Sequence, residues 1–204
     1  MKLIGMLDSP FVRRVAITLK LLGLEFEHQS VSVFRHWDAF REINPVVKAP
    51  TLIEDDGQTL MESTLILDYV LNAKKPGSSM LPAEPAQRFR ANRLIALSLA
   101  ICEKAVQIVY EHNLRPAEKL HQPWMDRVHT QLHAACAELE HELESEPFAM
   151  DERQFGLAGI TVAVAWNFTT AFVPDAVSVE KYPKLQAFSA FAEQQPTFVA
   201  TPAV

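Results

Sequence analysis

The chain has 204 residues with a net charge of −6 at pH 7, and 49% of its residues are hydrophobic. This composition is that of an ordinary globular protein, the length allows one large domain or two small ones, and the acidic balance argues against nucleic acid as a partner. No apolar run is long enough to span a membrane, and the N-terminus does not resemble an export signal. Two cysteines, Cys102 and Cys136, fall in helical patterns, which favours a reducing, cytoplasmic location.

The first stretch of the chain, up to Gly23, has the pattern of a short strand, a tight turn and an amphipathic helix. Ser9 is expected as the N-cap and Pro10 as the first helical residue, because a serine hydroxyl can accept from first-turn amides and proline has no N–H to leave unpaired. Gly23 is expected just after the helix end. A helix N-terminus after a strand can also stabilise an anion or a thiolate. From this stretch alone, a simple cap is the favoured interpretation.

The next part of the chain predicts further strands and helices. Residues 25–31 predict a short strand, and residues 34–43 predict a short irregular helix. Residues 51–53 and 59–61 predict the two strands of a hairpin. Ser63 is expected to cap the helix that follows. Together these elements predict a small α/β sheet with helices packed on it.

The composition changes at residues 77–85, where a Pro/Gly/Ser-rich segment predicts a linker between two domains, 1–76 and 86–204. Apolar residues at helical spacing predict that the second domain is all-helical. Its first helix, near Leu94 to Val109, carries two apolar stripes. One stripe is expected to pack within the domain, and the other on the first domain or on a partner subunit. Thr161 is expected to begin and cap a central, nearly all-apolar helix.

Four short motifs follow one another along the chain. They are Ser9-Pro10 with Val12 to Val15, Asn44-Pro45 with Lys48 to Leu52, Glu62-Ser63, and Tyr182-Pro183. None is specific alone, but their order and spacing resemble the cytosolic glutathione transferase superfamily over essentially the whole chain. The resemblance is greatest to bacterial members with a serine at the start of the first helix. It implies a thioredoxin-like α/β N-terminal domain, an all-α C-terminal domain and a homodimer.

The resemblance also implies that glutathione is bound as a co-substrate, by Lys48, Ala49, Pro50, Glu62 and Ser63. The Ala49–Pro50 bond would be cis, so that the amide and carbonyl of Ala49 face an extended ligand. Ser63 would donate to the α-carboxylate of the γ-glutamyl unit, and Glu62 would accept from its α-ammonium. Lys48 would face the glycine carboxylate. A solvated lysine and an ordinary helix cap are the structural alternatives.

Ser9 would be the catalytic residue in this family pattern. Its hydroxyl would donate to the thiolate of bound glutathione, and Ser9 would not itself act as a nucleophile. A thiol-transferase mechanism needs a cysteine at the same helix N-terminus, able to form a mixed disulfide with glutathione. Neither Cys102 nor Cys136 is there, so the sequence argues against that mechanism.

The reaction implied is addition of the glutathione thiolate to a small hydrophobic electrophile. The same thiolate could reduce a peroxide or assist an isomerisation. A non-catalytic binding or regulatory protein on this fold is the rival hypothesis, since fold does not fix function. The candidates for lining the electrophile pocket are Phe11, Tyr110 and Trp166, although these residue types are equally suited to the core.

A metal site is the weakest of the chemical hypotheses. His129, His133 and Cys136 could share one helical face at a spacing that suits metal ligands. Helices of globular proteins carry such sets by chance, and a fourth convergent ligand is not evident. The sequence therefore predicts no metal.

Overall fold

The computed structural model describes residues 1–203, and the chain divides into two compact units. Unit 1 comprises Met1–Met80 and Gln195–Val204, and unit 2 comprises Leu81–Gln194. The division after Met80 falls inside the stretch expected as a linker. The expected second domain, 86–204, differs from unit 2 because its last residues belong to unit 1. No helix in the described part of the chain is long and apolar enough to cross a membrane.

Unit 1 contains, within the described residues, a four-stranded sheet in the order β2-β1-β3-β4. The strands are β1 (Lys2–Ile4), β2 (Glu27–Gln29), β3 (Thr51–Ile53) and β4 (Thr59–Met61). β1 pairs in parallel with β2 and antiparallel with β3, and β3 pairs antiparallel with β4. Leu3 and Ile4 are completely buried, as suits a strand with a neighbour on each side. The predicted hairpin is confirmed as β3 and β4.

Helix α1 (Pro10–Leu21) begins and ends where the sequence predicts. Gly23 has φ +62°, in the left-handed region that glycine enters without a Cβ clash. The amide of Gly23 donates to the carbonyl of Lys20 at 2.9 Å, and the amide of Leu24 donates to the carbonyl of Leu19 at 3.0 Å. These two bonds are those of a Schellman motif, so the last carbonyls of α1 are satisfied inside the chain.

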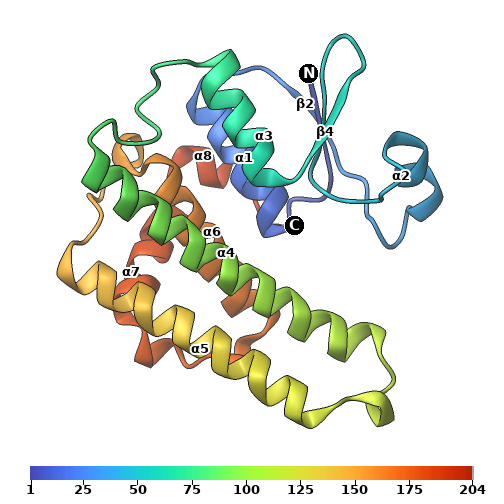
Figure 1. The fold of residues 1–204 in the computed structure, drawn as a ribbon, viewed down its shortest axis with the longest axis vertical. Coiled ribbons are helices and arrows are strands. Elements are labelled where there is room, and N and C mark those ends of the chain that lie inside the picture. Colours follow the sequence, from blue (N-terminus) through green and yellow to red (C-terminus); the bar gives the residue numbers. More distant parts are fainter. Residues whose placement is uncertain (204) are drawn as a thin grey trace. The chain divides into compact units, whose positions relative to one another are not determined.

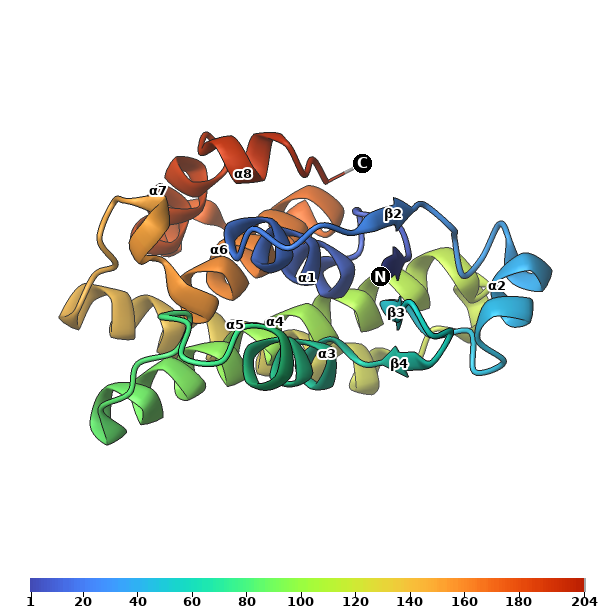
Figure 2. The ribbon, with the colours of Figure 1, turned by 90° about the horizontal axis from the view of Figure 1, so that it is seen from above.

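The other helices of this part of unit 1 lie on the two sides of the sheet. Helix α3 (Ser63–Tyr69) continues as a π-helical turn (Val70–Lys74), and α2 (Trp37–Ile43) precedes β3. α1 and α3 lie on one side of the strands and α2 on the other, as both ribbon views show (Figure 1, Figure 2). Phe40 of α2 is completely buried. This is the arrangement expected of a thioredoxin-like domain.

The C-terminal segment belongs to unit 1 because it packs on α1. Helix α8 (Pro196–Val199) buries Phe198 completely, and the Arg13 guanidinium carbon lies 5.7 Å from the centre of its ring. The Arg13 Nε donates to the carbonyl of Thr201 at 2.8 Å, and Lys20 Nζ donates to the carbonyl of Ala200 at 2.6 Å. These contacts join residues far apart in sequence, and helical periodicity does not predict them.

Unit 2 is built from four long helices of the described chain. They are α4 (Pro85–Leu114), α5 (Gln122–Ser145), α6 (Gly156–Phe172) and α7 (Pro183–Ala192). α4 packs against α5 and α6, and α7 packs against α5 and α6. Figure 1 shows α4 and α5 side by side and antiparallel. Most residues of α6 are buried, which confirms its predicted central position.

The predicted start of the central helix is wrong. α6 begins at Gly156, so Thr161 lies inside the helix, and its hydroxyl donates to the carbonyl of Leu157 at 2.7 Å. Residues 157–160, which precede Thr161, are buried. Their packing extends the helix toward its N-terminus, past the threonine that local capping rules select as the start. Thr161 therefore does not cap α6.

The N-terminus of α7 is capped by a side chain from another helix. Glu140 of α5 is 6% exposed, and its two carboxylate oxygens accept from the amides of Lys184 at 2.7 Å and Leu185 at 2.9 Å. A carboxylate satisfies unpaired first-turn amides and complements the helix dipole. Because Glu140 is on α5, these bonds also fasten α5 to α7.

We predict that Glu140→Gln lowers the free energy of unfolding by about 1–3 kcal/mol. A glutamine side chain has one acceptor oxygen where glutamate has two. One backbone N–H at the start of α7 therefore loses its acceptor. Glu144→Gln, on the same helix but exposed, should change stability by less than about 0.5 kcal/mol. Urea denaturation of both variants, followed by circular dichroism, measures the difference. Equal stabilities for the two variants would contradict the capping role of Glu140.

Candidate functional site

Segments from three parts of the sequence meet at the start of α1. Arg14 Nη1, one turn into the helix, donates to Ser63 Oγ at 3.1 Å. Gly5, with φ +134°, lies between α1 and the loop before β3, since a Cβ placed there would be 2.6 Å from Val12 Cγ2 and 3.0 Å from Ala49 Cβ. The loop that holds Ala49 and the start of α3 therefore both lie against the first turns of α1.

Ser9 occupies the N-cap position of α1 as predicted, but its side chain does not cap the helix. Its backbone is extended (φ −72°, ψ 123°), and Pro10 follows as the first helical residue. Within the described chain, the hydroxyl accepts no hydrogen bond from the amides of the first turn. The expected capping bond is therefore absent, and the partly exposed hydroxyl is left for another partner.

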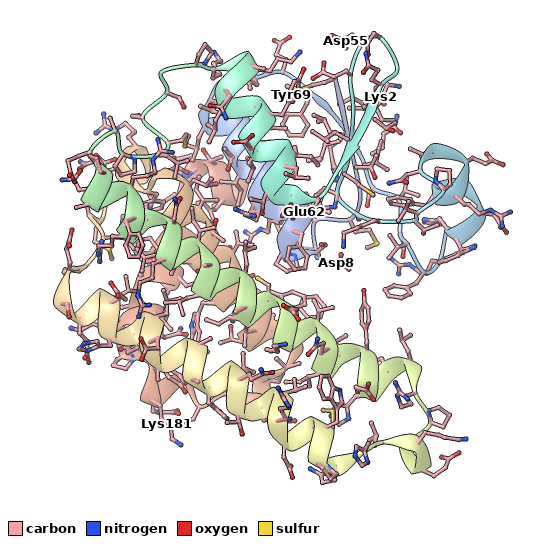
Figure 3. All side chains as sticks on the ribbon, in the orientation of Figure 1. Lys2, Asp8, Asp55, Glu62, Tyr69 and Lys181 are labelled. Atoms are coloured by element: carbon pink, nitrogen blue, oxygen red, sulfur yellow. The ribbon has the colours of Figure 1, made fainter. Side chains whose placement is uncertain are left out.

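The helix cap of α3 is Glu62, and the prediction that Ser63 is the cap is wrong. The Glu62 carboxylate accepts from the amide of Thr64 at 3.1 and 3.2 Å and from that of Leu65 at 3.2 Å. Glu62 has φ +78°, a conformation that a non-glycine residue adopts only when its surroundings hold it there. Figure 3 shows Glu62 at the start of α3 and Asp8 just before α1, at the same end of unit 1.

Ser63 and Arg14 form a buried pair, each about 1% exposed. Arg14 Nη1 also lies 3.4 Å from Thr64 Oγ1. A guanidinium has only donors, so the Ser63 oxygen acts as the acceptor, and the Ser63 hydroxyl in turn donates to Glu62 Oε1 at 3.4 Å. The contact of Arg14 with these hydroxyls was not predicted from the sequence. The available signal was an arginine among apolar positions of α1.

The loop before β3 presents the remaining candidate residues. The Ala49–Pro50 peptide bond is cis, as predicted. Lys48 is exposed, Ala49 is half-buried and Pro50 is buried. Among residues 1–203, no hydrogen bond uses the amide or the carbonyl of Ala49. This short segment thus offers one free backbone donor and one free acceptor next to a cation.

The three candidates for the electrophile pocket have different environments. Phe11, in unit 1, is partly exposed, and Tyr110, in unit 2, is 43% exposed. Trp166 is 1% exposed, and its Nε1 donates to Gln186 Oε1 at 2.8 Å. Trp166 therefore packs in the core of unit 2. A pocket that includes Phe11 and Tyr110 stays a prediction.

Cys102 of α4 and Cys136 and His133 of α5 are buried or partly buried. Both cysteines are buried thiols, and burial raises the pKa of the Cys136 thiol to about 12. The His133 Nδ1 lies 3.2 Å from the Tyr182 hydroxyl, and burial, with a smaller effect of nearby His129, lowers the pKa of His133. No group of three or more His, Cys, Asp or Glu residues suited to a metal ion occurs among residues 1–203.

Comparison with known proteins agrees with this arrangement. Residues 3–79 match the glutathione S-transferase N-terminal domain, and residues 92–196 match the glutathione S-transferase C-terminal domain. The uncharacterized GST-like protein YibF of Escherichia coli K12 is 27% identical over 82% of this chain and 83% of its own. A probable glutathione S-transferase of Glycine max is 31% identical over 78% of this chain and 67% of its own.

A solved structure extends the similarity to three dimensions. A glutathione transferase family member from Pseudomonas fluorescens Pf-5, determined with bound glutathione, is 30% identical with a TM-score of 0.81. The similarity covers 98% of this chain and 97% of that protein. Together with the sheet and helices described above, these matches show that the chain belongs to the glutathione S-transferase family.

Proposed function

We propose that this protein is a glutathione transferase that ionises the thiol of bound glutathione and adds the thiolate to a hydrophobic electrophile. The observation that supports this most is the Ser9 hydroxyl, which stands at the N-terminus of α1 without a capping bond. The segments of Ala49 and Ser63 lie against the same helix. Membership of the family makes glutathione the ligand to test first.

The energies suffice for thiol activation by Ser9 without a general base. A free thiol has a pKa of about 8.5, and lowering it by two units requires about 2.7 kcal/mol of preference for the anion. A hydrogen bond to a charged acceptor contributes about 1.5–3 kcal/mol, and a helix N-terminus contributes about 0.3–1 kcal/mol. Ser9 at the start of α1 would supply both contributions. The serine thus acts as a donor to the thiolate and forms no covalent intermediate.

The γ-glutamyl end of glutathione carries both a carboxylate and an ammonium group, and Glu62 with Ser63 offers a partner for each. The Ser63 oxygen accepts from Arg14 and its hydroxyl donates to Glu62 Oε1 over a long 3.4 Å, so the hydrogen would turn from Glu62 to the ligand carboxylate on binding. The Glu62 carboxylate accepts from two amides of α3, and a carboxylate has about four acceptor positions in total. It can therefore accept from the ammonium without releasing the helix.

The rest of the tripeptide is assigned to the loop before β3. The free amide and carbonyl of Ala49 suit an extended peptide, which offers a carbonyl and an N–H in return. Pro50, which is buried, anchors this loop next to β3. The exposed ammonium of Lys48 suits the glycine carboxylate at the far end. Phe11 and Tyr110 are the proposed contacts of the electrophile. The burial of both cysteine thiols agrees with a cytoplasmic location.

We predict that the protein is retained on immobilised glutathione, is released by free glutathione, and conjugates glutathione to a generic aromatic electrophile. Retention tests binding, and the increase in absorbance of the conjugate tests turnover. Binding without turnover over a panel of electrophiles, peroxides and isomerisable substrates would favour a regulatory protein on this fold. Turnover of a peroxide or of an isomerisable substrate alone would keep the site but change the reaction. Failure to bind glutathione would contradict the proposal.

We predict that Ser9→Ala raises the thiol pKa of bound glutathione by about one to two units, because the donor to the thiolate is lost. If the wild-type thiol pKa is about 6.5, the rate at pH 7 should fall about three- to twenty-fivefold, and the loss should shrink above pH 9, where the thiol ionises unaided. The pH-rate profile and the absorbance of the bound thiolate measure this.

Two controls make the Ser9→Ala result specific. Because the Ser9 hydroxyl makes no capping bond, the variant should keep its stability within about 0.5 kcal/mol. Ser145→Ala removes an exposed serine hydroxyl of unit 2, which donates to the carbonyl of His141 at 3.0 Å, and should change neither rate nor thiol pKa. If Ser9→Ala keeps most of its turnover at neutral pH, another donor ionises the thiol.

We also propose a homodimer. Large apolar side chains are exposed on each unit, with Leu65 on α3 at 56% and Phe89 on α4 at 74%. The second apolar stripe of α4 is a weaker argument than the sequence suggested, since Ile95 and Cys102 are at most 8% exposed in the single chain. Sedimentation at micromolar concentration should give the dimer mass, and Phe89→Asp should shift the equilibrium to monomer. A monomeric wild-type protein would contradict the proposal.

A further inference from the structure

The loop between α2 and β3 is held by a chain of side-chain hydrogen bonds. Asn44, which is 7% exposed, donates through Nδ2 to Thr51 Oγ1 at 2.9 Å and accepts through Oδ1 from the amide of Val46 at 3.0 Å. Thr51, which is completely buried, donates its hydroxyl to the carbonyl of Lys48 at 2.8 Å. We call this chain, from Asn44 through Thr51 to the Lys48 carbonyl, the loop latch.

The backbone inside the loop adopts a conformation that needs such support. Val47 has φ +52°, and a β-branched residue in the left-handed region is an outlier that persists only when its surroundings fix it. The amide of Val47 donates to the carbonyl of Asn44 at 2.9 Å, and this main-chain bond closes a turn over residues 44–47. Asn44 thus joins the loop through its main chain and through both ends of its side chain.

We propose that Asn44 and Thr51 are positioning residues for glutathione, acting through the peptide that joins Lys48 to Ala49. A trans peptide is planar, and its carbonyl and N–H point in opposite directions. The Thr51 hydroxyl holds the Lys48 carbonyl toward the protein interior, so the Ala49 N–H is turned away from it. This inference rests on the proposed function, in which that N–H contacts the ligand.

The packing of Ala49 agrees with this direction. Its Cβ faces Gly5, where the chain leaves no room for another side chain. The methyl group and the Lys48 carbonyl are therefore both engaged by the protein, and the amide is the group left over. Without the loop latch the Lys48–Ala49 peptide can rotate, and binding must then order it again. Ser9 is the N-cap residue of α1 and lies outside the latch, so ionisation of the bound thiol should not be affected.

The latch is tested by replacing one hydroxyl. Thr51→Val should weaken glutathione binding about tenfold, measured by calorimetry, while the thiol pKa of bound glutathione stays within about 0.3 units of wild type. Thr51→Ser keeps the hydroxyl and should restore most of the affinity. Thr169→Val is the matched control, because Thr169 is also completely buried and donates to a carbonyl at 2.8 Å, but in α6 of unit 2. It should bind glutathione as wild type does.

A second variant tests whether the latch acts as one chain. Asn44→Asp keeps the acceptor for the Val46 amide but lacks the Nδ2 donor to Thr51. Its effect on the glutathione Kd should not add to that of Thr51→Val, because either change breaks the same chain. Additive effects would mean that the two residues act separately and would overturn the latch.

The remaining outcomes separate this inference from the proposed function. If wild type binds glutathione and Thr51→Val binds equally well, the latch is wrong and the function stands. If Thr169→Val weakens binding as much as Thr51→Val, or if the thiol pKa moves with the Kd, the effect is general destabilisation and the latch is again wrong. If wild type does not bind glutathione, the proposed function fails and the latch fails with it.

Discussion

The buried guanidinium of Arg14 is the interaction on which the arrangement of unit 1 most depends. It lies at 1% exposure between α1 and the start of α3 and donates to the hydroxyls of Ser63 and Thr64. A hydrogen bond to a charged group contributes about 1.5–3 kcal/mol, more than an exposed ion pair usually does. The hydroxyls therefore fix where α3 begins relative to α1. The position of the candidate site therefore depends on buried contacts of unit 1 as well as on its loops.

The elements that the sequence predicts correctly are those with a complete local signal. Pro10 and Gly23 delimit α1 because one residue lacks an N–H and the other tolerates a positive φ. The errors arise where a residue with the right local chemistry is engaged by a distant one. Ser63 has the chemistry of a cap, but its oxygen accepts from Arg14, 49 positions away, and Glu62 caps the helix in its place. Residue spacing along one helix carries no information about such a partner.

Two other features could not be predicted from the sequence, for different physical reasons. The return of the C-terminal segment to unit 1 depends on a contact between Arg13 and Thr201, which are 188 positions apart. The loop latch joins Asn44 to Thr51, only seven positions apart, but it requires Val47 at positive φ, which β-branched residues avoid. Propensity argues against that conformation, so the structure was needed to find it. The residue types of the candidate site were recognisable, whereas the groups that orient them were not.

The division of polar groups between the units bears on where substrate selectivity can arise. The proposed glutathione contacts, from Ser9 to Ser63, all belong to unit 1. In unit 2, Trp166 donates to Gln186, and Tyr182 contacts His133, so these buried groups are satisfied by neighbours in the same unit. Groups already paired in a core cannot contact a second substrate without losing those bonds. Under the proposed function, the electrophile is then selected by partly exposed side chains, and substitutions there would change the electrophile without changing how the thiol is ionised.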